Sequence, residues 1–193
     1  MMRNAILIVP GLAILFPAGP VEAQSPPMSY GIGIVANAPR QFTGLGVHFL
    51  LPGLRGFGLY LDAKFDPLSD TRDGVLLAYT RAEAEALGDQ WFGDEERWTT
   101  FNAALLYEVT DELRLYAGVG PSRQEGFTRY WDEVGERGEL GYYWIENPDR
   151  TGTQINLLGG AFFRIARGFF VQFGLESQPQ GYTLGLTLSL PRR

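Results

Sequence analysis

The stretch GYTLGLTLSL at residues 181–190 decides the fold, because its two sets of alternate residues are chemically unlike. One set is Tyr182 followed by four leucines, and the other holds only glycine, threonine and serine. Strict alternation with a period of two predicts a β-strand with two different faces. The small polar face carries no charge, which is unusual for a strand face that meets bulk water. We therefore expect the small residues to line an interior and the leucines to meet lipid.

The same alternation recurs along the chain and predicts eight strands. They span residues 28–36, 42–51, 56–65, 98–109, 113–120, 153–165, 169–176 and 181–190. The connections after the second, fourth and sixth strands are short, whereas those after the third and fifth have roughly 30 residues. Short turns at one rim and long loops at the other are typical of outer-membrane barrels. The sequence thus predicts an all-β fold, an eight-stranded antiparallel up-and-down transmembrane β-barrel, with long external loops at about 66–97 and 121–152.

Two central stretches carry a family resemblance. Residues 101–107, FNAALLY, and residues 115–120, LYAGVG, are similar to the fourth and fifth strands of the small eight-stranded outer-membrane β-barrel proteins of Gram-negative bacteria. That family includes the OmpA-, OmpX- and OmpW-like barrels. The residues that match its C-terminal assembly signal are Thr183, Gly185, Leu188 and Leu190. The resemblance implies the bacterial outer membrane as location, with lipid or lipopolysaccharide and the barrel-assembly machinery as partners.

Composition excludes several classes of protein. The 193-residue chain has no cysteine, so it has no disulfide, no thiolate metal site and no cysteine nucleophile. Its net charge of −6 argues against nucleic acid as a partner. Lys64 is the only lysine, whereas soluble proteins spread several over their surface, so the exterior is expected to avoid water.

Residues 1–23 are expected to be a secretory signal peptide, which would leave 24–193 as the mature barrel. Arg3 supplies the charged start and residues 5–16 the apolar core, and Val21-Glu22-Ala23 offers small residues at the two positions that a signal peptidase reads. The alternative is a membrane anchor. The apolar stretch is shorter than the roughly 20 residues a spanning helix needs, and proline and glycine interrupt it.

Charged and amide side chains on the inner face form the candidate functional site. By strand parity this lumen polar network consists of Asp62, Lys64, Glu108, Arg114, Arg164, Gln172 and Glu176. Glu108 should lie opposite Arg114 across the turn at residues 110–112. An eight-stranded barrel has just enough interior for side chains to fill. The network therefore either plugs the barrel or lines a narrow path for small ions, and we expect the plug.

His48 is the only histidine and the one candidate for catalytic chemistry. Some outer-membrane barrels modify lipopolysaccharide with a histidine and a serine two residues apart, but Gly46 and Leu50 flank His48 at that spacing. We expect His48 to lie beside Tyr60 and to bond to its hydroxyl. Inward glycines should let Tyr60 or Tyr116 lie against the wall. The sequence predicts no enzyme, no catalytic residue, no metal site and no cofactor.

The two long segments at 66–97 and 121–152 are acidic, with sixteen acidic residues and seven arginines. Within the first, residues 81–87 predict a short helix that ends at Gly88. The acidic residues either bind divalent cations that bridge to lipopolysaccharide phosphates or are simply solvated. Clustered aromatic residues either form an interfacial belt or a protein-binding surface, and residues 142–145 could extend the sixth strand.

The predicted function is that of an integral outer-membrane barrel with a structural or interaction role, or with narrow small-solute passage, and without catalysis. A secreted soluble barrel of the lipocalin type, with a small apolar ligand inside, is an alternative. A third hypothesis is an outer-membrane lipid-modifying enzyme. Alternation does not separate the first two, because a barrel turned inside out keeps its parity. The uncharged face of residues 181–190, the connection lengths and the scarcity of lysine favour lipid outside.

Overall fold

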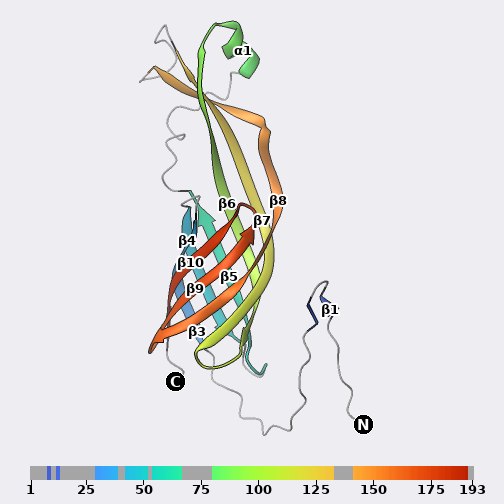
Figure 1. The fold of residues 1–193 in the computed structure, drawn as a ribbon, viewed down its shortest axis with the longest axis vertical. Helices are drawn as coiled ribbons and strands as arrows, with labels where there is room; N and C mark the ends of the chain where they lie inside the picture. The colour runs from blue at the N-terminus through green and yellow to red at the C-terminus, as the bar shows by residue number, and fades with distance from the viewer. Residues whose placement is uncertain are drawn as a thin grey trace.

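A computed structural model of the chain describes residues 29–38, 42–51, 54–66, 80–132 and 141–190, and the backbone of residues 8–9 and 12–13. Within these residues eight strands close into one antiparallel barrel (Figure 1). They are β3 (Tyr30–Ala38), β4 (Thr43–Leu50), β5 (Phe57–Phe65), β6 (Gln90–Glu108), β7 (Leu113–Trp131), β8 (Tyr142–Ala166), β9 (Phe169–Ser177) and β10 (Gln180–Ser189). Two further strands, β1 (Ile8–Val9) and β2 (Leu12–Ala13), pair only with each other. The predicted signal peptide spans residues 1–23, and all of it except β1 and β2 lies outside the described residues.

Every strand of the barrel pairs with the next one in the chain, and β10 closes the ring against β3. The closing register runs from Tyr182 opposite Ala38 to Ser189 opposite Gly31. This order confirms the predicted eight-stranded up-and-down barrel. Short turns at 109–112 and 167–168 lie at one end of the barrel, which we call the turn end.

The leucine face of β10 points outward, as predicted. Leu184 and Leu186 are 46% and 52% exposed, whereas Thr183 and Thr187 are 0% and 2% exposed. The same outward apolar surface runs around the wall and includes Ile34, Leu45, Phe101, Leu105, Leu157 and Phe173. A soluble lipocalin-type barrel would bury these residues inside, so that alternative does not fit. The chain is a transmembrane β-barrel, the architecture of bacterial outer membranes.

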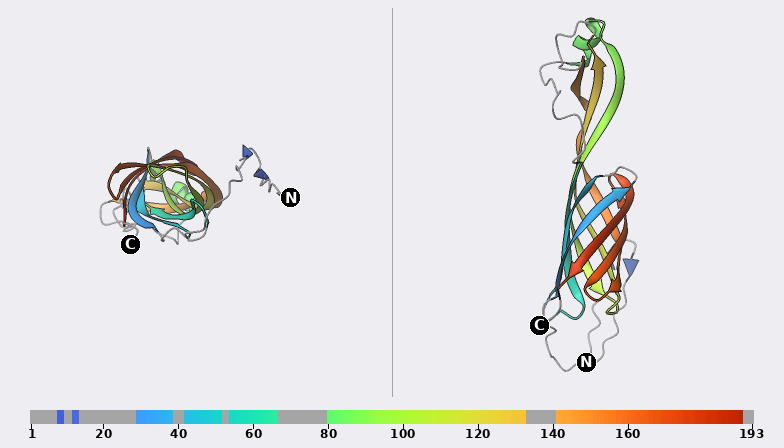
Figure 2. Two further views of the ribbon diagram at one scale, coloured as in Figure 1. Left: turned by 90° about the horizontal axis from the view of Figure 1, so that it is seen from below. Right: turned by 90° about the vertical axis from the view of Figure 1, so that its left-hand side faces the viewer.

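Three strands continue far beyond the barrel rim and form a second region, which we call the head (Figures 1 and 2). The head comprises residues 80–98, 123–132 and 141–153. Long loops were expected at 66–97 and 121–152. Within the described residues, 90–97, 121–131 and 142–152 are instead strand, because cross-strand pairs such as Arg97 with Glu125 continue the ladder upward. No helix in the described part of the chain is both long enough and apolar enough to cross a membrane.

The predicted short helix is present as α1 (Arg81–Ala86) at the top of the head. Thr80 caps it: the Glu83 amide donates to the Thr80 hydroxyl at 3.3 Å, and the Thr80 amide donates to the Glu83 carboxylate at 2.7 Å. The helix ends before Gly88, whose φ of +81° lies in the left-handed region that glycine favours.

Candidate functional site

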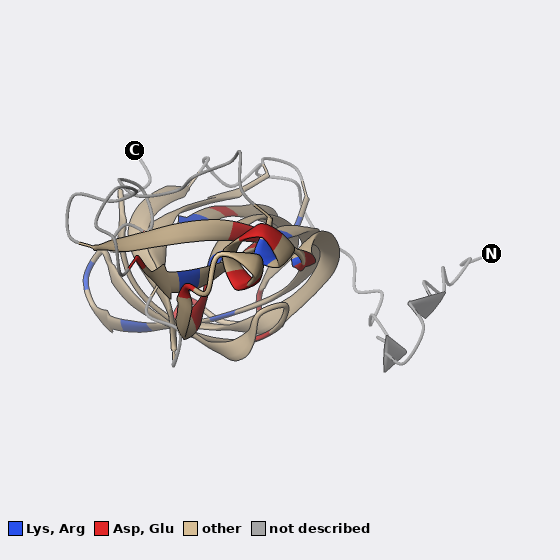
Figure 3. Cartoon of the chain, turned by 90° about the horizontal axis from the view of Figure 1, so that it is seen from above, with Lys and Arg blue, Asp and Glu red and all other residues tan. Residues whose placement is uncertain are grey.

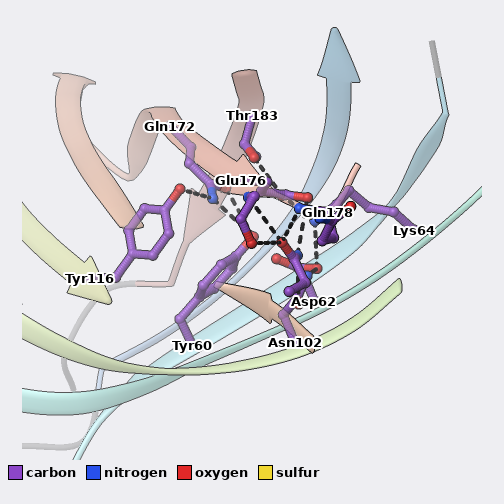
Figure 4. Close-up of polar contacts among 11 residues, drawn as sticks. Tyr60, Asp62, Lys64, Asn102, Tyr116, Gln172, Glu176, Gln178 and Thr183 are labelled. Carbon is purple, nitrogen blue, oxygen red and sulfur yellow. Dashed lines mark hydrogen bonds and ion pairs between the residues drawn. The ribbon is translucent and has the colours of Figure 1, made fainter. Parts of the chain in front are cut away.

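The upper layer of the lumen is built around Lys64 (Figure 4). Its ammonium lies 2.7 Å from Asp62 on the same strand and 2.7 Å from Glu176 on β9, the strand diametrically opposite β5 in the ring. All three side chains are fully buried. Asn102 donates to Asp62 at 2.8 Å, and the Thr183 hydroxyl donates to Glu176 at 2.5 Å. One lysine thus crosses the lumen and joins two walls of the barrel.

The middle layer is a pair of tyrosines held by one amide. The Gln172 side chain donates to the hydroxyls of Tyr60 and Tyr116, at 2.9 Å each. A Cβ at Gly46 would lie 3.0 Å from the Tyr60 ring, and one at Gly174 only 2.1 Å from the Tyr116 hydroxyl. The prediction that glycines let these tyrosines lie against the wall is confirmed.

The lower layer, near the turn end, is organised by Arg114. Its guanidinium lies 2.9 Å from Glu108, the predicted partner directly opposite it on β6, and packs 4.4 Å from the Phe170 ring centroid. A guanidinium only donates, so the 2.8 Å contact with His48 makes the Nε2 atom of His48 an acceptor and the ring neutral.

The predicted hydrogen bond between His48 and the Tyr60 hydroxyl is wrong. The two residues are cross-strand neighbours, as expected. However, the longer tyrosine reaches Gln172 in the middle layer, while His48 meets Arg114 in the layer below.

Arg164 also departs from the other members of the predicted network. It has inward parity but is exposed at the turn end, with its guanidinium carbon 5.4 Å from the Phe170 ring centroid. The remaining six predicted residues lie within the barrel, and Glu108 is the least buried of them. The predicted polar network did not include Asn102, Asn156, Tyr60 or Tyr116. The two tyrosines were expected to lie against the wall, and the inward parity of the two asparagines was a usable signal.

This arrangement fills the barrel. Tyr60, Leu106, Phe162 and Gln172 are each at most 1% exposed. Within the described residues no group of three histidine, aspartate or glutamate side chains is placed to hold a metal ion. The chemistry that the lumen supplies is charge neutralisation and hydrogen bonding across the barrel, as in a plug.

One face of the head sheet carries a cluster of aromatic residues around a cation. The Arg129 guanidinium lies 4.4 Å from the ring centroid of Phe92, 5.0 Å from that of Tyr142 and 5.2 Å from that of Trp144. Each distance is within the range of cation–π attraction. The sequence showed these aromatic residues but gave no sign of their common partner.

The opposite face of the head sheet packs against α1. Ala84 of the helix, Tyr130, Tyr143 and Ile145 form a buried apolar cluster, and the Tyr143 hydroxyl donates to Asp89 at 2.6 Å. Acidic residues gather on α1 and the adjoining strands when the molecule is viewed from above (Figure 3). The head is thus an aromatic core with an acidic surface.

No protein-family model and no curated protein matches the chain. Among solved structures it is similar to Ail, the attachment invasion locus protein of Yersinia pestis, with 11% identity and a TM-score of 0.43 over 86% of this chain and 97% of that one. It is also similar to a major outer membrane protein of Thermus thermophilus, with 14% identity and a TM-score of 0.48 over 84% and 99%. A third is the N-terminal β-barrel domain of Pseudomonas aeruginosa OprF, with 14% identity and a TM-score of 0.40 over 86% and 98%.

Proposed function

We propose that this chain is an integral protein of the bacterial outer membrane whose plugged barrel anchors the head, and that the head binds a protein partner. Residues 1–23 would direct secretion as a cleaved signal. The barrel-assembly machinery would recognise Thr183, Gly185, Leu188 and Leu190 in the last strand. Lipopolysaccharide and phospholipid would surround the apolar wall.

The observation that carries this proposal is an open strand edge on β8. The pairing of β8 with β9 begins at Leu158 opposite Glu176, whereas its pairing with β7 continues up to Tyr142. Among the described residues no strand pairs with the other edge of residues 144–156. An open edge presents backbone N–H and C=O groups that an extended peptide can join as an added strand.

The direction of these backbone groups follows from one contact. The Leu157 amide donates to the Ser177 hydroxyl of β9 at 2.8 Å, so it points toward the open side of β8. The register with β7 is unbroken from Gly152 to Leu157. Because backbone groups alternate along a strand, Thr153 and Ile155 also direct their N–H and C=O groups to the open edge.

Charge indicates the kind of partner. Residues 151–157 carry no charge, so nothing along the edge itself repels a neutral strand. The acidic excess of the two long segments creates a negative field around it, which favours a basic protein segment. Divalent cations compete for the same acidic residues, but the carboxylate of Asp94 is already 3.3 Å from the Arg150 guanidinium.

The test uses the whole protein in lipid nanodiscs and a phage-displayed library of extended peptides. We expect selected peptides to be basic and their binding to weaken with salt. Thr153→Pro removes one edge N–H, so it should abolish binding, whereas the matched control Thr153→Ala keeps that N–H and should bind normally. Equal binding to both variants would contradict pairing at this edge.

The plug is tested separately by planar-bilayer recording on the same preparation. Side chains that are almost fully buried across the middle layer leave no path for ions, so the bilayer should stay silent. A steady single-channel conductance would contradict the plug and support small-solute passage, whatever the peptide result.

A further inference from the structure

A cavity of about 670 Å³ opens at the turn end of the barrel, at the opposite end from the head. Three of its lining residues are arginines, namely Arg114, Arg164 and Arg167. The chain as a whole has a net charge of −6, whereas this cavity gathers three positively charged side chains.

Two of these arginines have no ionic partner in the part of the chain that the structure describes. Arg114 lines the cavity but is neutralised by Glu108. Among the described residues, neither Arg164 nor Arg167 makes an ion pair or a side-chain hydrogen bond, and both are exposed. Asp111 is the only other acidic residue among the described residues that line the cavity, so these residues together carry a net positive charge.

One aromatic ring holds two of the cations close together. The guanidinium carbons of Arg114 and Arg164 lie 4.4 Å and 5.4 Å from the same Phe170 ring centroid. They are therefore no more than about 10 Å apart, within one Debye length of roughly 10 Å at 0.1 M salt. Both also line the cavity, so an anion inside it is attracted by both charges.

The cavity also has an apolar side that reaches the outer wall. Leu188 and Leu190 line it, and both face outward on or just after β10, with 43% and 41% of their surface exposed. Ser29, Arg114 and Phe170 line it from within the barrel. The cavity thus crosses the rim, with cations on one side and lipid-facing leucines on the other.

We propose that this cavity binds a phosphate group through Arg164 and Arg167, which both line it, and that the phosphate is presented by an anionic phospholipid or by a free phosphate ester. Guanidinium groups match the geometry of phosphate oxygens and form two hydrogen bonds to one group. A phospholipid would lay its acyl chains along Leu188 and Leu190, whereas a free ester would use only the arginines. This site is separate from the head and does not depend on the proposed protein partner.

The test is native mass spectrometry of the full chain in a nonionic detergent with added phosphatidylglycerol. We expect one lipid to stay bound to the wild type. Arg164→Gln combined with Arg167→Gln should weaken that binding about tenfold or more, since each hydrogen bond to a charged group contributes about one order of magnitude. This double variant keeps Arg114 and hence the lower layer of the lumen.

The matched control removes two arginines outside the cavity, by Arg55→Gln and Arg81→Gln. Arg55 lies in the turn between β4 and β5 at the same rim, and Arg81 lies in the head. This control should bind the lipid as the wild type does. Equal loss in both double variants, or no loss in either, would show non-specific lipid association and overturn the proposal.

Competition then identifies the source of the phosphate. If glycerol 3-phosphate fails to displace phosphatidylglycerol, the apolar side of the cavity contributes and the ligand is a lipid. If glycerol 3-phosphate displaces it at an equal concentration, the site accepts free phosphate esters. Failure of both to bind the wild type would contradict a phosphate site of either kind.

Discussion

One half of β6 lies in the barrel wall and the other half in the head, and the two halves differ in which residues they expose. In the barrel half, residues 99–108, outward apolar side chains alternate with buried inward ones. In the head half, residues 90–98, only Trp98 is buried and acidic and aromatic residues are mixed on both faces. Trp91 and Phe101 are equally exposed, at 58% each, but one meets water and the other the membrane.

The difference also changes what a charge contributes. In the upper layer of the lumen the ion pairs of Lys64 are fully buried, so leaving one member without its partner is costly. In the head the ion pair between Arg97 and Glu125 keeps 24% of each side chain exposed, and such pairs contribute little. The head is therefore held by its aromatic clusters, and the barrel interior by paired charges.

The largest effect is expected from Lys64→Met. It leaves Asp62 and Glu176 buried without their cation, which should lower the free energy of unfolding in detergent by about 3–5 kcal/mol. Chemical unfolding with urea measures this. Adding Asp62→Asn and Glu176→Gln to the same chain should restore most of the loss. The matched change in the head, Arg97→Met, should cost less than about 1 kcal/mol, and similar costs for the two would remove the distinction between the regions.

Leu186→Arg comes next, because it places a charge on the lipid-facing wall. Leu186 is 52% exposed, and the cost near the middle of the bilayer should be about 2–4 kcal/mol. Leu87, in the head, is equally exposed at 54% but faces water, so Leu87→Arg should change stability by less than about 0.5 kcal/mol. Unfolding in lipid vesicles compares the two. Equal effects would mean that the outer face of β10 is not in contact with hydrocarbon.

Arg114→Ala should cost about 2–3 kcal/mol, since Glu108 and His48 both lose their donor in a largely buried layer. The cost is smaller than for Lys64 because Glu108 is 13% exposed and can recover water. Replacing Arg114 and Glu108 together by methionine should cost less than Arg114→Ala alone. A thermal midpoint in detergent that does not change on Arg114→Ala would argue against this pairing.

The barrel could be predicted because alternation records the difference between its two faces directly. Leucine on one side of β10 and threonine on the other specify parity, and parity placed Asp62 and Lys64 inside. The pairing of Glu108 with Arg114 followed from a turn of known length. These features depend only on spacing along the chain.

The features that were not predicted depend on side-chain length and on which environment covers each residue. The spacing of residues along the sequence does not record either property. His48 and Tyr60 are neighbours in register, yet side-chain length decides that they meet different partners. Arg164 shares the parity of the lumen but sits too near the rim to be covered. Apart from the possible extension of the sixth strand at 142–145, the head strands were not predicted. In the head half of β6, acidic and aromatic residues are mixed on both faces, so the sequence shows no alternation of apolar and polar residues there.

The smallest effect is a pH dependence confined to the head. Burial by itself would raise the pKa of Glu125, but hydrogen bonds and charges from Arg97 and Arg123 outweigh it and lower the pKa below the ordinary 4.5. A lowered pKa in the folded state means that the ionised carboxylate stabilises the fold above the ordinary glutamate pKa. This stabilisation is lost as the pH falls through the lower, folded-state value. Hydrogen exchange of amides near Arg97, corrected for the intrinsic rate at each pH, should therefore lose protection on acidification. Glu125→Gln should remove that dependence while barrel amides stay protected, because the ladder around β10 does not involve this carboxylate.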